Sequence, residues 1–401
     1  MSATRLDPQD PSLERLTDLA SSSFGGRAIF ATDEWFAAAH LLLTPDAPVF
    51  ITDKFTDYGK WMDGWETRRK RIAGQDWCII ELGLRGTIDA IDVDTAFFTG
   101  NHSPRVSVQA ARFSSDHSTW PQALQKLTAK ALPAGQERAM GVAASAEDLA
   151  LAEQLKSHEW VDILPFVELR PGYEATRHNV FKIVQQGPWT HLRLNMFPDG
   201  GIARLRVYGT VLKDWTQVPP MQLVDLVSAE HGGKIIGFND AHYGHPKNLI
   251  APGRSKTMAG GWETARKSTR PAVLTANAAT GLLEVPGKDW CVLKLGHAGV
   301  IHEVEVDTNH FKGNFPESCV LFGTTFHGKA DQDVLGDNIV WKPILPRLKL
   351  RAHEQQYFSV QKGIVNLVPE GVNFVKLEMF PDGGISRLRL RGYKKDAQSS
   401  L

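Results

Sequence analysis

Residues 196–202 read Met-Phe-Pro-Asp-Gly-Gly-Ile, and the same seven residues return at 379–385. In both places one further residue and then Arg-Leu-Arg follow. Identity over such a stretch marks an internal repeat, and two copies this far apart indicate that a whole domain is duplicated. The organisation of the chain therefore depends on where else its two halves agree.

Four more blocks occur in both halves, in the same order. They are Gly-Trp-Glu-Thr at 64–67 and 261–264, Asp-Trp-Cys at 76–78 and 289–291, Val-Asp-Thr at 93–95 and 306–308, and Gly-Asn at 100–101 and 313–314. Only the spacing between blocks drifts, as loop insertions would cause. We predict an N-terminal helical segment at 1–23, homologous domains at 24–210 and 231–394, a linker at 211–230 and a tail at 395–401.

Within each copy the pattern is typical of β-strands. Residues 88–94 alternate apolar and polar side chains in their second half, and so do 191–196 and 204–208, as half-buried strands do. The Pro-Asp-Gly-Gly turn at 198–201 predicts that the last two form a hairpin. Many short strands between Gly, Pro and Asn turns favour an all-β jelly-roll sandwich. A helical insertion is expected at 121–160 in the first copy.

Composition excludes several classes of protein. The chain of 401 residues has 45 Lys and Arg against 45 Asp and Glu, so it lacks the basic excess of a nucleic-acid or membrane-surface binder. Its longest apolar run, near 37–43, is too short to span a bilayer. Three cysteines, Cys78, Cys291 and Cys319, do not form a disulfide framework. We expect buried free thiols and a cytoplasmic protein.

The repeated blocks resemble the allantoicase family over almost all of residues 24–394. The most specific pieces are Asp-Gly-Trp-Glu-Thr-Arg at 63–68, Phe-Thr-Gly-Asn at 98–101 and the doubled Met-Phe-Pro-Asp-Gly-Gly-Ile. The resemblance implies two galactose-binding-like jelly rolls. It also implies hydrolysis of allantoate to (S)-ureidoglycolate and urea in purine degradation, and a homo-oligomer. The resemblance assigns no catalytic residues, so we choose candidates from what the reaction requires.

Allantoate carries one carboxylate and two ureido arms on its central carbon, and hydrolysis releases one arm as urea. Urea leaves readily only when its nitrogen is protonated, which requires a general acid, and a base must activate water. Four carboxylates lie in the repeated blocks and are our candidate catalytic residues: Glu66, Glu263, Asp94 and Asp307.

The substrate also needs binding groups. Arginine can hold its carboxylate in a bidentate pair, and amides or aromatic rings can hold the planar ureido arms. The candidates are Arg68, Arg69, Arg266, Trp65, Trp262, Asn101, Asn314 and His242. We expect no cofactor and no metal ligands. The alternative is a divalent ion bound by His and Asp, although the chain has no tightly spaced pair of histidines with a carboxylate.

Structural interpretations compete with each of these assignments. The Trp-Glu-Thr-Arg stretch could instead be a structural corner, with its Glu paired to its Arg and its Trp in the core. Asp94 and Asp307 could be loop caps that bind backbone N–H groups. Duplication preserves fold residues as well as site residues, so positions where the copies differ, such as Trp35 against His242, are informative. The functional alternatives are a non-catalytic tandem carbohydrate- or ligand-binding sandwich and a scaffolding repeat.

Overall fold

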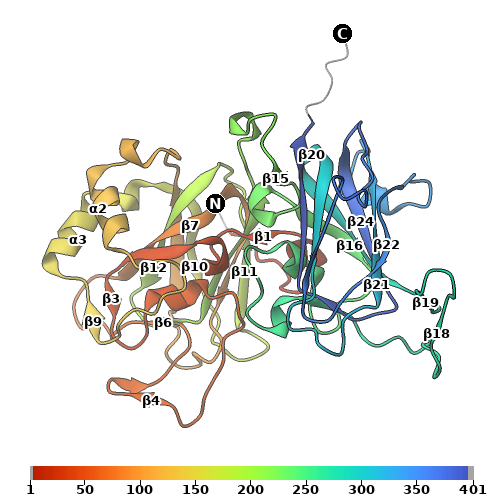
Figure 1. Cartoon of the computed structure of the whole chain (residues 1–401). Coiled ribbons are helices and arrows are strands. Elements are labelled where there is room, and N and C mark those ends of the chain that lie inside the picture. Colours follow the sequence, from red (N-terminus) through yellow and green to blue (C-terminus); the bar gives the residue numbers. More distant parts are fainter. Residues whose placement is uncertain (1–2, 396–401) are drawn as a thin grey trace. The chain divides into compact units, whose positions relative to one another are not determined.

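The structure is a computed structural model that describes residues 3–395. Its contacts divide the chain into two compact units, Met1–Leu212 and Lys213–Leu401 (Figure 1). The break falls inside the segment expected to be a linker, and the later part of that segment pairs with the second unit through β15 (Val224–Asp225) and β26 (Arg387–Lys394). The expected tail at 395–401 lies, apart from Lys395, outside the described residues.

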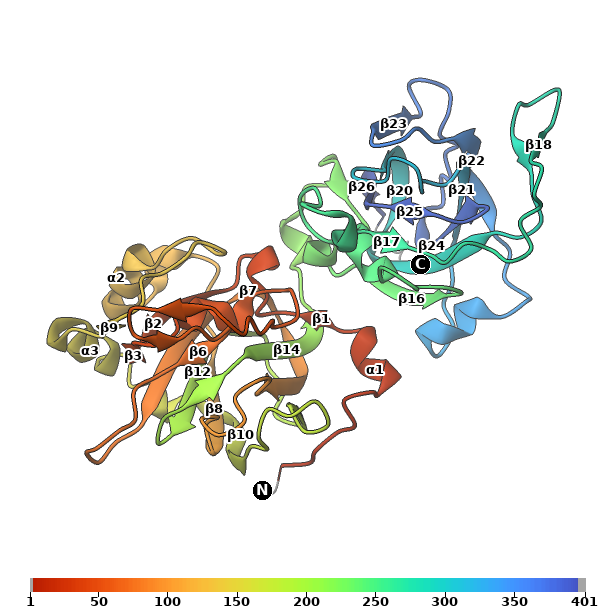
Figure 2. The same cartoon turned by 90° about the horizontal axis from the view of Figure 1, so that it is seen from below.

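In the first unit one long strand, β7 (Asp76–Asp94), joins two sheets (Figure 2). Its first half pairs with β2 (Arg27–Ala31) and β12 (Trp189–Phe197), and β8 (Arg105–Ala111) and β10 (Val161–Glu168) extend that sheet. Its second half pairs with β11 (His178–Lys182) and β14 (Arg204–Val211), with β1 (Thr17–Asp18) beyond. The result is a sandwich whose two sheets share a bent strand.

Glycines allow the long strand to change sheets. A Cβ at Gly83 would lie 2.6 Å from the carbonyl oxygen of Phe24, and one at Gly86 would lie 2.3 Å from that of Thr210. No side chain fits where backbones approach this closely. The Asp-Trp-Cys block therefore begins a strand whose later glycines are required by packing.

The core of the first unit lies between these sheets. Apolar side chains from β7, β8, β12 and β14 form it, including Ile80, Val93, Val108, Leu192 and Leu205, all fully buried. Each such side chain stabilises the fold by about 1.5–3 kcal/mol relative to its exposed state. Alternation along the strands places these residues inward, as the sequence predicts.

The second unit repeats the first strand by strand. The central strand β20 (Asp289–Asp307) corresponds to β7, and the order β15-β26-β20-β24-β21-β22 matches β1-β14-β7-β12-β8-β10. Its other strands are β16 (Lys234–Phe238), β21 (Ser318–Thr324), β22 (Lys342–Lys349), β23 (Gln355–Ser359) and β24 (Val372–Phe380). The register is also kept, because Met379 faces Asp289 as Met196 faces Asp76. The predicted all-β fold of two homologous jelly rolls is confirmed.

The predicted hairpin at 191–208 is wrong. Strands β12 and β14 do not pair with each other but lie on opposite sides of β7. Between them β13 (Gly201–Ile202) pairs with β6 (Trp65–Glu66), so the turn carries the chain from one sheet to the other. Alternation correctly identified the strands, but it carries no information on which strand each one pairs with.

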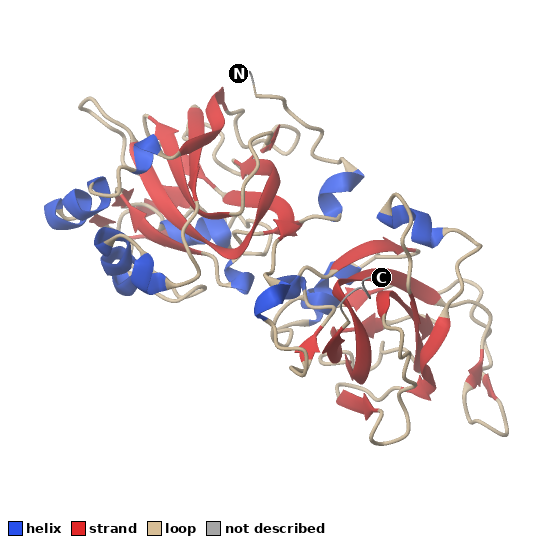
Figure 3. Cartoon of the chain, turned by 90° about the horizontal axis from the view of Figure 1, so that it is seen from above, coloured by secondary structure: helices blue, strands red, loops and turns tan. Residues whose placement is uncertain are grey.

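The units differ mainly in their insertions (Figure 3). The first unit carries the predicted helical insertion, with α2 (Gln122–Lys130) and α3 (Ala146–Glu153), and β9 (Val142–Ala143) pairs with β3 (Asp33–Glu34). A small hairpin of β4 (Phe55–Thr56) and β5 (Gly59–Lys60) also protrudes from it. The second unit has instead a hairpin of β18 (Thr275–Ala276) and β19 (Leu283–Glu284).

The N-terminal segment is less helical than expected. Helix α1 (Pro11–Glu14) makes a single turn capped by Asp10, and β1 follows it and pairs with β14. Within residues 3–395, every helix is too short or too polar to cross a membrane.

Candidate functional site

Three of the repeated blocks meet at one place in the first unit. The backbone of Gly201 pairs with Glu66 on one side, and on the other its N–H donates to the carbonyl of Asn101 at 2.8 Å. A side chain at Gly201 would overlap the ring of Phe98, with a Cβ only 2.1 Å away. The Met-Phe-Pro-Asp-Gly-Gly-Ile segment therefore lies between the Glu and Asn blocks and holds them together.

The turn also fixes the loop that follows Glu66. Thr67 exchanges hydrogen bonds with the backbone of Gly200, and the carboxylate of Asp199 accepts a 2.7 Å bond from the N–H of Lys70. The ammonium of Lys70 contacts Asp76 at 2.8 Å. Glu66 and the residues after it are held from both sides, so the side chain of Glu66 has a defined position.

Glu66 and Asn101, both candidates, form a pair. The amide of Asn101 donates to a carboxylate oxygen of Glu66 at 2.6 Å. Burial raises the pKa of Glu66 to about 7, although the hydrogen bond from Asn101 opposes the shift. A carboxyl group with a pKa near neutrality can donate and accept a proton under ordinary conditions, which general acid–base catalysis requires.

The second unit builds the same arrangement. Gly384 pairs with Glu263 and donates to the carbonyl of Asn314 at 2.8 Å, and the amide of Asn314 donates to the carboxylate of Glu263. Asp382 accepts from the N–H of Lys267 at 2.9 Å, as Asp199 does from Lys70. The strands involved are β17 (Trp262–Glu263) and β25 (Gly384–Ile385).

A cavity of about 510 Å³ opens beside Glu263 and Asn314, within the usual range of small-molecule sites. Its wall also contains Tyr243, Arg266 and Phe315. Further charged side chains in the wall come from loops and from the end of β22: Arg270, Glu317, Asp382 and Lys349. The predicted residues Glu263, Asn314 and Arg266 therefore lie together around one concave surface.

The three candidate arginines differ. Arg68 is held by Asp33, with a 2.7 Å hydrogen bond from its Nε, and it stacks on Trp35. Arg69 and its counterpart Arg266 are exposed, and neither has an ionic or hydrogen-bonding partner among residues 3–395. Arg69 and Arg266 remain available to bind a carboxylate, whereas Arg68 is already occupied.

Asp94 and Asp307 both bind groups of the fold itself. Asp94 is buried in a bidentate pair with Arg177 and accepts from the N–H of Ala96. Asp307 pairs in the same way with Arg254, at 2.9 and 3.1 Å, and caps the N–H of Asn309. The capping interpretation is the correct one, because these oxygens are engaged within the fold.

Three further candidates also change role. Trp65 and Trp262 have no exposed surface, and their indole N–H groups donate to the carbonyls of Asp33 and Asp240. They belong to the core and present no face to a substrate. His242 is exposed and packs against Tyr243, and it is Tyr243 that lines the cavity. The cysteine prediction holds, because Cys78, Cys291 and Cys319 are buried free thiols.

The sequence interpretation missed Tyr243, Arg270 and Lys349 in the cavity, and His102 in the first unit. His102 corresponds to Phe315, and its buried Nδ1 lacks a hydrogen-bond partner in the described chain. His102 directly follows the Gly-Asn block, so the substitution of Phe by His was a usable signal. Lys349 lies outside every repeated block, and no such signal was present.

Among the described residues, no group of three or more His, Cys, Asp or Glu side chains is arranged to hold a metal ion. The expectation that the protein needs no metal remains a prediction for experiment. The two sites contain Glu, Asn and Arg side chains, and His102 follows Asn101 in the first unit.

Comparison with known proteins gives a consistent family. The allantoicase repeat model matches twice, over residues 17–212 and 224–395. A probable allantoicase of Pseudomonas fluorescens is 38% identical over 95% of this chain and 97% of its own length. A probable allantoicase of Acinetobacter baumannii is also 38% identical, over 95% of this chain and 94% of its own length.

A solved structure agrees. Allantoicase from Saccharomyces cerevisiae is 29% identical with a TM-score of 0.69, and the match covers 98% of this chain and all of that one. The match spans both units, as the internal repeat requires. The chain belongs to the allantoicase family.

Proposed function

We propose that the protein is an allantoicase, which hydrolyses allantoate to ureidoglycolate and urea. Membership of the family over the whole chain supports the reaction. The observation that carries the site is the hydrogen-bonded pair of amide and carboxyl found in each unit, Asn101 with Glu66 and Asn314 with Glu263. A free guanidinium, Arg69 or Arg266, lies just after the repeated block that contains each glutamate. A non-catalytic ligand-binding sandwich is not favoured, because the relatives are allantoicases along their full length.

Glu66 supplies the proton transfer. With a pKa of about 7 it is protonated in a large fraction of molecules near neutrality, and it donates that proton to the nitrogen of the departing urea. The C–N bond to the central carbon then breaks, and the lone pair of the remaining ureido nitrogen stabilises the cationic carbon. The carboxylate of Glu66 takes a proton from the water that adds to this carbon, so Glu66 ends protonated as it began.

Arg69 and Asn101 position the substrate. The free guanidinium of Arg69 matches a carboxylate in the bidentate manner that Arg favours. The amide of Asn101 already orients the carboxyl group of Glu66, and its own oxygen is an acceptor for ureido N–H groups. Fixing the reacting groups in this geometry lowers the entropic part of the barrier.

The test measures urea released from allantoate by the full chain and by Glu66→Gln. We expect wild type to release urea and Glu66→Gln to be slower by about 10²–10⁴-fold, because the amide cannot transfer a proton. The wild-type rate should fall as pH rises through about 7, since the protonated form of Glu66 is the active one.

The exposed Glu159 provides a matched control, because Glu159→Gln makes the same chemical change on a side chain that is 61% exposed. Glu159→Gln should keep the wild-type rate and pH profile. Folded wild-type protein that releases no urea would refute the reaction, whereas an unchanged rate for Glu66→Gln would refute only the role of Glu66.

We also propose that the protein is cytoplasmic, homo-oligomeric and independent of a cofactor. Three buried free thiols suit a reducing compartment. Acid–base chemistry by Glu66 requires no metal. Urea release measured with and without a chelator tests this, and a loss restored by one divalent ion would contradict it.

A further inference from the structure

The region around Glu66 in the first unit, here called the first site, corresponds to the cavity beside Glu263 in the second unit, here called the second site. The two sites differ in charge. The strand registers make Glu168 the counterpart of Lys349, because Glu168 faces Arg105 on β8 as Lys349 faces Ser318 on β21. The second site therefore has a lysine where the first has a glutamate. It also has Phe315 where the first has His102.

Two cations that line the cavity of the second unit have no acidic partner within residues 3–395. Asp382 contacts Arg270 at 3.6 Å, and Glu317 contacts Arg347 at 3.4 Å. The remaining cations, Arg266 and the ammonium of Lys349, are exposed and have no anionic partner among the described residues. Glu263 remains as an acceptor, hydrogen-bonded to Asn314.

This arrangement fits a particular class of molecule. Two free cations that line one cavity attract a carboxylate, and the carboxylate of Glu263 accepts N–H donors such as those of a ureido group. Tyr243 and Phe315 supply flat surfaces for a planar arm.

We propose that this cavity is a second binding site for a small ureido carboxylate, the chemical class of allantoate and ureidoglycolate, and that it binds its ligand without hydrolysing it. The identity of the ligand rests on the proposed function. The division of roles rests on the positions where the two sites differ: the first has His102 and Glu168, whereas the second has Phe315 and Lys349.

Equilibrium dialysis of radiolabelled allantoate against the full chain tests the proposal. The Glu66→Gln variant is used so that the ligand survives the measurement. We expect two allantoate molecules bound per chain. Combining Arg266→Ala with Lys349→Ala should leave one, because losing both cations weakens the second site by at least about tenfold.

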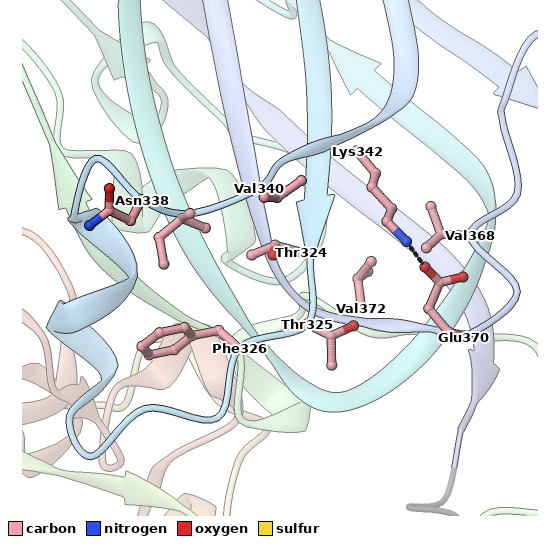
Figure 4. A pocket seen from close by; sticks show the side chains of 10 residues that line it. Thr324, Thr325, Phe326, Asn338, Val340, Lys342, Val368, Glu370 and Val372 are labelled. Atoms are coloured by element: carbon pink, nitrogen blue, oxygen red, sulfur yellow. Dashed lines mark hydrogen bonds and ion pairs between the residues drawn. The ribbon is translucent and has the colours of Figure 1, made fainter.

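Lys342 provides the matched control. It lies at the other end of β22 from Lys349, where it pairs with Glu370 beside a different cavity (Figure 4). Lys342→Ala removes the same charge from the same strand and should leave both molecules bound. Because Arg266, Lys349 and Lys342 are all exposed, their variants should unfold at the wild-type temperature.

Three outcomes would overturn the proposal. They are one allantoate per chain in Glu66→Gln, two in the double cavity variant, or urea release that survives Glu66→Gln but is lost in Glu263→Gln. The last would place hydrolysis in the second unit. These results are separate from a failure of the proposed function, which would appear as no urea from wild-type protein.

Discussion

The two units share one scaffold but stabilise it differently. Both bury an aspartate at the end of the long central strand, Asp94 in the first and Asp307 in the second, and both pair it with an arginine. Arg177 immediately precedes β11, whereas Arg254 lies in the loop after η7 (Pro246–Ile250). The aspartate is retained while the source of the cation changes, which indicates that the fold requires the buried carboxylate and only a compensating charge.

This comparison predicts unequal losses when the aspartates are removed. Asp94→Ala leaves Arg177, only 13% exposed, with the exposed Glu174 at 3.8 Å in place of a buried partner, and should destabilise the first unit by about 3–5 kcal/mol. Asp307→Ala leaves Arg254, which is 49% exposed and can be solvated, so its cost should be about 1–2 kcal/mol less. Urea denaturation of the full chain, followed by fluorescence, measures both.

A double variant tests the same explanation. Arg177→Met together with Asp94→Ala removes both buried charges, and it should recover part of the stability lost in Asp94→Ala alone. Equal losses for Asp94→Ala and Asp307→Ala would show that the exposure of the arginine does not matter, and would contradict this account.

A second contrast concerns the helical insertion of the first unit. Arg138, in the segment between α2 and α3, contacts the buried Glu34 at 2.9 Å and donates to the carbonyl of Ala28. In the second unit the residue corresponding to Glu34 is Ala241, and the helical insertion is missing. The insertion and the buried carboxylate thus occur together in one unit and are both missing from the other.

Arg138→Ala should destabilise the first unit by about 1–3 kcal/mol at pH 7, because Glu34 loses its cation. Burial already raises the pKa of Glu34 above its ordinary value of 4.5, and the loss of Arg138 raises it further. A raised carboxyl pKa means that stability falls as pH increases from 4.5 through the folded value. The loss should therefore be larger at pH 7 than at pH 4.5.

Glu34→Ala tests the same contact from the other side. The combined variant Arg138→Ala with Glu34→Ala should lose less stability than Arg138→Ala alone, since no buried charge remains. Thermal melts at the two pH values measure this. A loss from Arg138→Ala that does not depend on pH would show that Glu34 is not involved.

Much of the fold could be predicted from the sequence, because five repeated blocks define the duplication and alternation identifies the strands. Strand pairing could not, since the partners of β12 and β14 are set by the bent strand β7 between them. Glu66 and Asn101 are candidates because both lie in repeated blocks, and the structure pairs them. Asp94 is a candidate for the same reason, but the structure holds it in a pair with Arg177, because repetition marks residues that the fold needs as readily as residues of a site.

The smallest expected effect is that of Arg68→Ala, and its comparison with Arg69→Ala separates a residue that the fold uses from a residue of the site. Arg68→Ala gives the first unit the residue found at Ala265 in the second, and removes a half-exposed contact with Asp33 and stacking on Trp35. It should cost no more than about 1 kcal/mol of stability and leave KM for allantoate unchanged. Arg69→Ala, at the neighbouring free guanidinium, should raise KM about tenfold or more. A rise in KM for Arg68→Ala equal to that for Arg69→Ala would show that Arg68 leaves Asp33 to bind substrate, and that the difference between the two units at this position is functional.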